Sequence, residues 1–196
     1  NKIVCDLPAY TVDLRTGYFS GEPIVFASDN QAQHEAIRDI IEYNDFQDLN
    51  AELDIMSSIY GHAFMVVYID EDGMLRLGVD DPYNTLVIHD STIEHKVMGA
   101  LRYFEFSDAV TNEDKIKITL YTKEMIYELE GPLTNPVVVG EQPNIFGDIP
   151  VIEFVENSNR CGSFEKQISI VDAIENVLSS SINEIQYFDN AYLHLK

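Results

Sequence analysis

The sequence predicts an α+β fold, in which a body of helices and a mostly antiparallel sheet precedes one long C-terminal helix. Three changes of pattern along the chain predict it. Apolar residues lie three and four apart up to Tyr60, alternate with period two through the middle of the chain, and return to helical spacing after Gly162. We therefore place an α+β body in residues 1–156, and a linker with the long helix in residues 157–196.

Three helices are expected in the first third of the chain. The first covers residues 9–19 and has Pro8 in its first turn. Polar residues 28–30 can cap a second helix that ends at Tyr43. The third helix ends at Gly61, and its buried seam consists of Phe46, Leu49, Leu53, Met56 and Tyr60.

A sheet is expected from the period-two segments. Residues 64–69 are apolar on both faces, as in a central strand that is covered from both sides. Residues 71–73 form a hairpin turn, and residues 131–147 are rich in Pro and Gly and indicate a loop. The remaining expected strands are residues 23–27, 74–79, 86–89, 97–106, 116–122, 125–129 and 149–155.

The last helix is expected from Ser163 to Tyr192, because this segment contains no Pro, no Gly and, after Lys166, no Lys or Arg. An apolar spine repeats every seven residues, at Phe164, Val171, Leu178, Ile185 and Tyr192, and is flanked by Ile168, Ile174, Ile182 and Phe188. The opposite side carries a stripe of polar residues without any cation, formed by Glu165, Ser169, Asp172, Asn176, Ser179, Asn183, Gln186 and Asn190. A solvated helix face normally mixes Lys with Glu, so the composition of this polar stripe is unusual.

The net charge is −22, from 34 acidic and 12 basic residues. Such a field repels phosphates, which argues against tight sequence-specific DNA binding, although an acidic protein can still enclose DNA without gripping it. Cys5 and Cys161 have no paired spacing, which fits a reducing compartment. The apolar run at residues 63–69 is too short to span a bilayer. Since the chain opens at Asn1, we expect a fragment of a longer protein.

The sequence contains no phosphate-binding loop, no dinucleotide-binding glycine motif and no nucleophile elbow. We therefore expect no catalysis, no cofactor and no metal. One alternative stays open: His89-Asp90 and Glu94-His95 offer four possible metal ligands, so the chain would be an acidic globular enzyme or a metal-binding domain. The other interpretation of these residues is a polar turn between two strands.

Eight blocks in one order resemble a known family. They are 16–24 (TGYFSGEPI), 58–64 (SIYGHAF), 68–73 (YIDEDG), 79–82 (VDDP), 88–94 (IHDSTIE), 144–154 (NIFGDIPVIEF), 169–173 (SIVDA) and 190–193 (NAYL). Together they resemble the portal proteins of tailed double-stranded DNA bacteriophages, in particular phages with long non-contractile tails. The resemblance covers essentially the whole chain; Cys161 departs from it, where a small or polar residue is expected.

The resemblance implies a subunit of a dodecameric ring at the unique capsid vertex, which is a conduit for DNA packaging and ejection and has no catalytic role. It implies contacts with other copies of itself, with terminase, the head-tail connector, scaffold and major capsid proteins, and with DNA that passes without sequence-specific binding. The location would be the virion, and the host cytoplasm during assembly, without a membrane. Residues 1–156 would be a wing-like body that forms most of the wing, and the long helix would be the first stem helix. The clip, second stem helix, tunnel loop and crown would lie beyond Lys196.

The residues and the resemblance lead to the same expectation for the long helix. A polar stripe without cations suits a channel wall, because fixed Lys or Arg side chains would hold passing phosphates. We expect the stripe to face the channel or the adjacent stem, and the apolar spine to be buried in protein. The alternative is an amphipathic helix with an ordinary solvated face.

Overall fold

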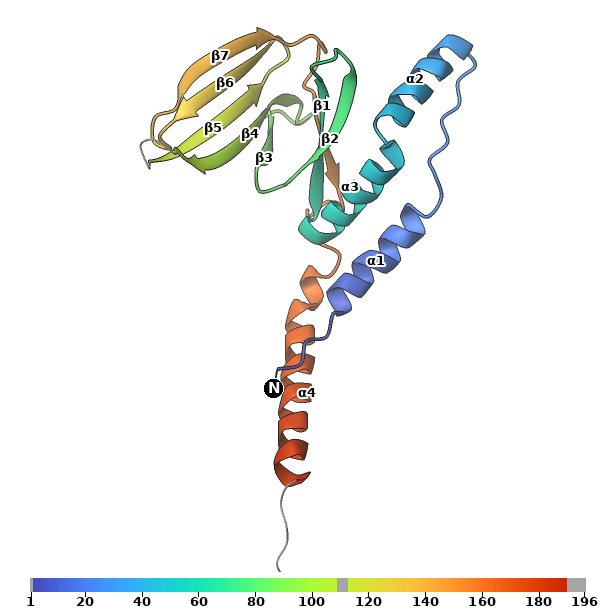
Figure 1. Ribbon diagram of the computed structural model, residues 1–196, viewed down its shortest axis with the longest axis vertical. Coiled ribbons are helices and arrows are strands. Elements are labelled where there is room, and N and C mark those ends of the chain that lie inside the picture. The colour runs from blue at the N-terminus through green and yellow to red at the C-terminus, as the bar shows by residue number, and fades with distance from the viewer. Residues whose placement is uncertain (1, 109–112, 190–196) are drawn as a thin grey trace, which may run out of the picture.

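A computed structural model describes residues 2–108 and 113–189 of the chain. The body consists of three helices and two antiparallel sheets, and one long helix projects from it (Figure 1). This arrangement confirms the predicted α+β fold. None of the described helices combines the length and the apolarity that crossing a bilayer requires.

The three N-terminal helices are α1 (Leu7–Phe19), α2 (Gln31–Tyr43) and α3 (Phe46–Tyr60). Each is bounded by the predicted signals: Pro8 lies in the first turn of α1, and the Asn30 side chain accepts hydrogen bonds from two backbone N–H groups at the start of α2. The expected strand at residues 23–27 is wrong, because this segment is exposed and pairs with no described strand.

The smaller sheet has the order β2-β1-β8, with β1 (His62–Ile69) between β2 (Leu75–Asp80) and β8 (Val151–Val155). Helix α3 covers one face, where Leu53 packs against Ala63 and Met65. On the other face, Phe64 and Val66 pack against the second sheet. The predicted central strand, covered from both sides, is therefore confirmed.

The larger sheet is a meander in the order β3-β4-β5-β6-β7. Its strands are β3 (Thr85–His89), β4 (Val97–Ser107), β5 (Asp114–Tyr121), β6 (Met125–Gly131) and β7 (Val137–Pro143). Strand β7 corrects the prediction that residues 131–147 form a loop. It is an edge strand, and its bounding prolines can be accommodated there because one side of an edge strand needs no hydrogen bonds.

Asp80, at the end of β2, joins the two sheets. Its carboxylate is buried and accepts a hydrogen bond from the Thr85 hydroxyl on β3 at 2.5 Å. The same carboxylate accepts hydrogen bonds from both Nε and Nη2 of Arg102 on β4. A buried charge of this kind is tolerated because it is paired and hydrogen-bonded. These bonds hold the first two strands of the larger sheet against the end of β2.

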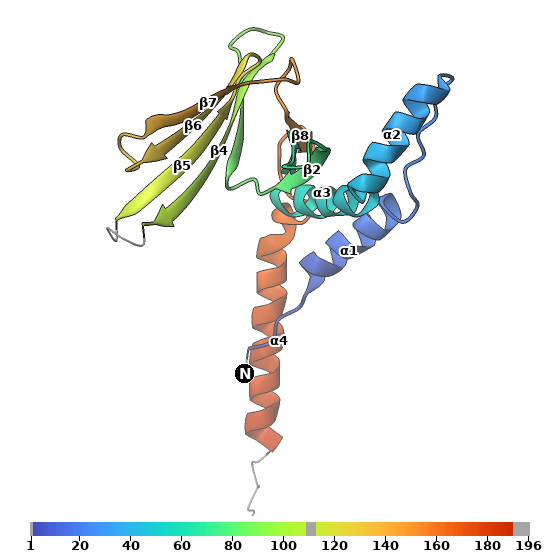
Figure 2. The same ribbon diagram turned by 45° about the horizontal axis from the view of Figure 1, so that its top comes forward.

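The chain leaves β8 through a short linker and enters a 3-10 turn, Glu165–Gln167, followed by α4 (Ile168–Asp189). The predicted long helix is confirmed, although its regular part begins five residues after Ser163. With 22 residues, α4 is about 33 Å long. Figure 2 shows that most of its length extends away from both sheets.

We predict that Gly61→Ala destabilises the protein far more than Gly73→Ala. Both glycines have positive φ angles, 84° and 78°, that L-residues adopt at a cost of about 1 kcal/mol. A Cβ atom at Gly61 would lie 2.1 Å from the backbone oxygen of Arg160, whereas a Cβ atom at Gly73 meets nothing within 4 Å. Urea denaturation should show a loss of about 3 kcal/mol or more for Gly61→Ala and about 1 kcal/mol for Gly73→Ala. Equal losses would show that the linker does not pack closely on α3.

Candidate functional site: helix α4 and its anchor

The polar stripe lies along one side of α4. Its members Ser169, Asp172 and Asn176 are exposed, as are Asn183 and Gln186 further along the helix. Glu165 is different, because it lies in the 3-10 turn before α4 and its carboxylate accepts the backbone N–H of Gly162 at 3.0 Å. Asn190, and Tyr192 of the spine, lie outside the described residues.

The apolar side of α4 is largely uncovered. Phe164, Val171 and Ile182 are half-buried, but Leu178 is 40% exposed and Ile185 is 67% exposed. Further exposed apolar residues on α4 are Ile168, Ile170, Ile174, Val177 and Phe188. Such a continuous apolar surface marks an interaction site more often than a solvated helix face.

The N-terminal segment runs beside α4 (Figures 1 and 2). The backbone N–H of Ile3 donates to the Ser179 hydroxyl, and that of Cys5 donates to Glu175 Oε1, both at 2.9 Å. These contacts were not predicted, because helical spacing says nothing about a segment 170 residues away in sequence. Ser179 is therefore a half-buried anchor at the edge of the stripe.

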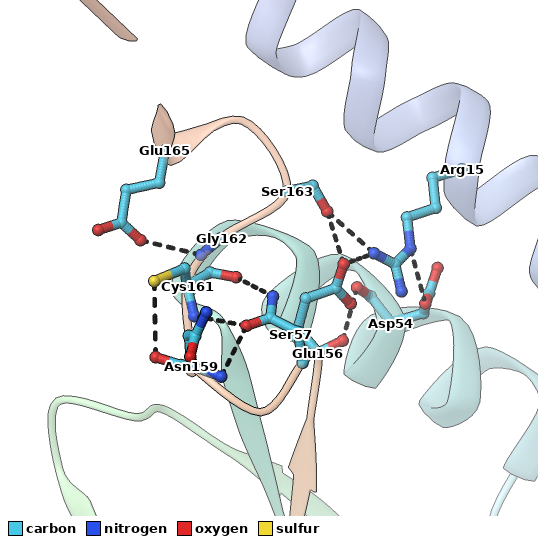
Figure 3. A network of polar contacts seen from close by, with 10 residues as sticks. Arg15, Asp54, Ser57, Glu156, Asn159, Cys161, Gly162, Ser163 and Glu165 are labelled. Atoms are coloured by element: carbon cyan, nitrogen blue, oxygen red, sulfur yellow. Dashed lines mark hydrogen bonds and ion pairs between the residues drawn. The ribbon is translucent and has the colours of Figure 1, made fainter. Parts of the chain in front are cut away.

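A polar cluster anchors the start of α4 to the body (Figure 3). The Arg15 guanidinium on α1 pairs with Glu156 after β8 and lies 3.8 Å from Asp54 Oδ1 on α3. It also donates to the Ser163 hydroxyl at 3.0 Å, and that hydroxyl donates to Glu156 at 2.9 Å. The Arg15 side chain is 38% exposed, whereas the two carboxylate side chains are 6% exposed. One cation thus ties α1, α3 and the chain leading into α4.

This anchor cluster holds more negative charge than Arg15 can pair. Asp54 Oδ2 and Glu156 Oε2 are buried and have no hydrogen-bond partner among the described residues. Unpaired buried carboxylate oxygens carry a desolvation penalty, so the cluster depends strongly on its one guanidinium.

The linker before α4 is closely packed and internally bonded. Gly162 lies so near α3 that a Cβ atom there would be 2.3 Å from the Ile59 oxygen. The Asn157 amide donates to the Cys161 oxygen at 2.7 Å, and its own oxygen accepts the Cys161 N–H. Arg160 forms a bidentate pair with Glu153 on β8, and these hydrogen bonds hold the pKa of Glu153 below its ordinary value. The linker is therefore a built connection and not a flexible tether.

The residues from His89 to His95 form the turn between β3 and β4. Asp90 Oδ1 accepts the backbone N–H groups of Thr92 and Lys96 and the Thr92 hydroxyl, and the Thr92 hydroxyl bond is the main cause of the lowered pKa of Asp90. Glu94 pairs with Lys96. Among the described residues, no three His, Cys, Asp or Glu side chains are grouped as metal ligands. The geometry fits the polar-turn interpretation of this segment.

We predict that Arg15→Met lowers the free energy of unfolding by about 3 kcal/mol, because it leaves two buried carboxylates without a cation. Arg38→Met is the matched control: Arg38 pairs with Asp39 and Glu42 on the exposed side of α2, where such pairs contribute about 0.5 kcal/mol or less. Urea denaturation of the two variants measures the difference. Similar small losses would mean that the anchor cluster contributes little to stability.

Comparison with known proteins identifies relatives over the whole of this architecture. A family described as phage portal protein, SPP1 Gp6-like, matches residues 1–196. The portal protein of Bacillus phage SPP1 is 24% identical over 199 residues, which cover 94% of this chain and 39% of that protein. The portal protein of Clostridium phage phiCD119 is 20% identical over 206 residues, covering 95% of this chain and 45% of that protein.

The chain thus spans less than half the length of both relatives. The family match confirms the resemblance seen in the eight sequence blocks, and it extends over the body, the anchor cluster and α4. The chain belongs to the SPP1 Gp6-like family of phage portal proteins.

Proposed function

We propose that this chain is part of a portal subunit that assembles into a dodecameric ring at the unique capsid vertex, where the ring conducts DNA during packaging and ejection. In this role the body is the wing, and α4 is the first stem helix beside the channel. The observation that carries the proposal is the two-sided surface of α4, since one side lacks cations and most of the other side has no apolar partner among the described residues.

The apolar side of α4 supports assembly. Exposed residues such as Ile174, Leu178 and Ile185 form a strip along a helix that extends away from its own body. A neighbouring subunit in a ring would cover this strip, and burial of the exposed part of each side chain stabilises the contact by roughly 25 cal/mol per Å² of apolar area. Closed rings repeat one heterologous contact, so a single strip of this kind serves every subunit.

The polar stripe supports passage of DNA. Asp172 and Asn176 are exposed, and no Lys or Arg follows Lys166 within residues 167–195. A channel wall of this composition forms no fixed ion pair with a phosphate, so DNA can move past it. The net charge of −22 adds a repulsive field that favours sliding over binding.

The remaining parts of the proposal concern the complete protein. Its partners would be other copies of itself, terminase, the head-tail connector, scaffold and major capsid proteins, and DNA held without sequence specificity. The subunit would act in the virion and, during assembly, in the host cytoplasm. Its role would be structural, without a catalytic group, cofactor or metal.

Introducing Lys at Asn176 and Asn183 together is expected to leave ring assembly intact and to slow DNA packaging by about threefold or more, because two cations per subunit would hold phosphates. The matched control replaces both residues by Gln, which keeps an amide and adds no charge. Packaging rates of both variants should be measured at two salt concentrations, and the defect of the Lys variant should shrink at the higher one. If the Lys variant packages at the wild-type rate although the stripe lines the channel, the sliding-wall argument is wrong.

Leu178→Asp should separate folding from assembly. Leu178 is 40% exposed in the single chain, so an Asp side chain there stays hydrated and lowers the melting temperature little. In a ring the same carboxylate would be buried against a neighbour without a partner, which opposes association. Sedimentation of the full-length variant should therefore show folded subunits and no rings, whereas Ser180→Asp, on an exposed polar position of α4, should still form rings. Wild-type rings from Leu178→Asp would contradict burial of the spine.

A further inference from the structure

The larger sheet has two faces of different chemistry. Side chains alternate along each strand, and residues paired across strands point to the same side, so the strand register assigns every residue to a face. The inner face carries Ala100, Tyr121 and Ile126, which pack toward Phe64 and Val66 of the smaller sheet. The opposite side is called the outer face here.

The outer face is apolar across all five strands. By register its large apolar residues are Leu86, Ile88, Leu101, Tyr103, Ile116, Ile118, Leu120, Met125, Tyr127, Leu129 and Val138, and three charged residues lie on the same side. None of these residues belongs to the two core clusters, although Ile116 is buried and the residues of the central strands are half-buried. No described helix packs against this sheet (Figures 1 and 2). At the two edge strands Leu86 is 56% exposed and Val138 is 57% exposed. A sheet with one uncovered apolar face lacks the second layer that such a face normally has.

The basic residues of the larger sheet all lie on one of its two faces. Glu105, Asp114 and Glu141 lie on the outer face and are exposed. The three basic residues within the described strands of this sheet, Arg102, Lys115 and Lys117, all lie on the inner side, where they pair with Asp80, Asp108 and Glu128. The apolar outer face therefore has an acidic margin and, within the described strands, no cation.

A hollow of about 410 Å³ lies at the acidic end of the outer face. Ile116 and Leu133 provide apolar walls, and Glu105 and Asp114 provide carboxylates. The remaining lining comes from Phe106, Ser107 and Lys115. Because Lys115 is paired with Asp108, a basic side chain entering the hollow would meet the carboxylates of Glu105 and Asp114, neither of which forms an ion pair with another described residue.

We infer that the outer face binds an amphipathic helix of another protein, with its apolar side on the sheet and Lys or Arg residues along its flanks. The apolar row Leu86, Leu101, Leu120 and Tyr127 crosses four strands, a distance of about 14 Å. That distance matches about ten residues of an α-helix. Acidic margins attract basic flanks and repel a second copy of this chain, which carries 34 acidic and 12 basic residues. The inference does not depend on ring formation.

The test uses the full-length protein and two designed helical peptides of about 18 residues with the same Leu stripe. One peptide has Lys flanks and the other has Glu flanks. Fluorescence anisotropy should show micromolar binding of the Lys peptide, weaker at high salt, and at least about tenfold weaker binding of the Glu peptide.

Adjacent residues on β7 supply a matched control. Val138 lies on the outer face and Val137 on the inner face, and their exposed fractions are 57% and 55%. Val138→Lys and Leu86→Lys should each weaken binding of the Lys peptide about tenfold or more. Val137→Lys adds the same charge one residue away, and it should change the affinity by less than about twofold.

Three results would overturn the inference. Equal effects of Val137→Lys and Val138→Lys would show attraction by the overall field alone. Absence of peptide binding would show that the outer face is not open to a helix in the full protein. A change of oligomeric state in Val138→Lys, seen by sedimentation, would assign the face to a second copy. Ring formation is scored separately by electron microscopy, so failure here leaves the proposed portal role standing, and failure of that role leaves this result intact.

Discussion

Arg15 joins the parts of the molecule that must keep a fixed relation to one another. Its guanidinium reaches Asp54 on α3, Glu156 at the end of β8 and Ser163 at the entrance to α4. The two carboxylates are buried and outnumber the cation, so loss of Arg15 would leave both without compensation. The close approach of Gly162 to the end of α3 adds a steric constraint at the same place. Together these contacts make the direction of α4 a property of the folded body.

A fixed direction has consequences for the surface of α4. The helix extends beyond the sheets, and among the described residues the N-terminal segment covers part of its flank through Ser179 and Glu175. The exposed part of its apolar spine can therefore be buried only by a partner outside the described residues, whereas most of the polar stripe is exposed to solvent. The body has the same character in its larger sheet, where one face packs internally and the other carries Leu101, Leu120 and Tyr127. A subunit built to work in an assembly would show such surfaces.

Most of the fold could be predicted from the sequence, because its signals are local. The seam of α3 around Leu53 and the two-sided apolar strand β1 follow from periodicity, and both are confirmed in the core. Strand β7 was missed because Pro and Gly dominate its surroundings, and a strand at an edge tolerates them. The segment at residues 23–27 was overpredicted, because composition cannot tell whether a sheet edge lies nearby.

The candidate site could be predicted only in part. Spacing alone assigns Asp172 and Asn176 to one side of α4, and both are exposed there. The anchor cluster was not predicted, because Arg15, Asp54 and Glu156 are far apart in sequence and each looks like an ordinary surface charge. A signal did exist in retrospect: Arg15 is the only basic residue of α1. The role of Ser179 as an anchor for the N-terminal segment has no sequence signal that we can identify.

The most direct test of the central claim is a cryo-EM structure of the full-length ring, in which the surroundings of each side of α4 can be determined. We expect Asp172 and Asn176 to face the channel or the adjacent stem helix, and Ile174, Leu178 and Ile185 to be buried against protein. The body should meet α4 through the same contacts of Arg15. A ring in which the polar stripe lies on the outside, with the apolar residues toward the channel, would contradict the account.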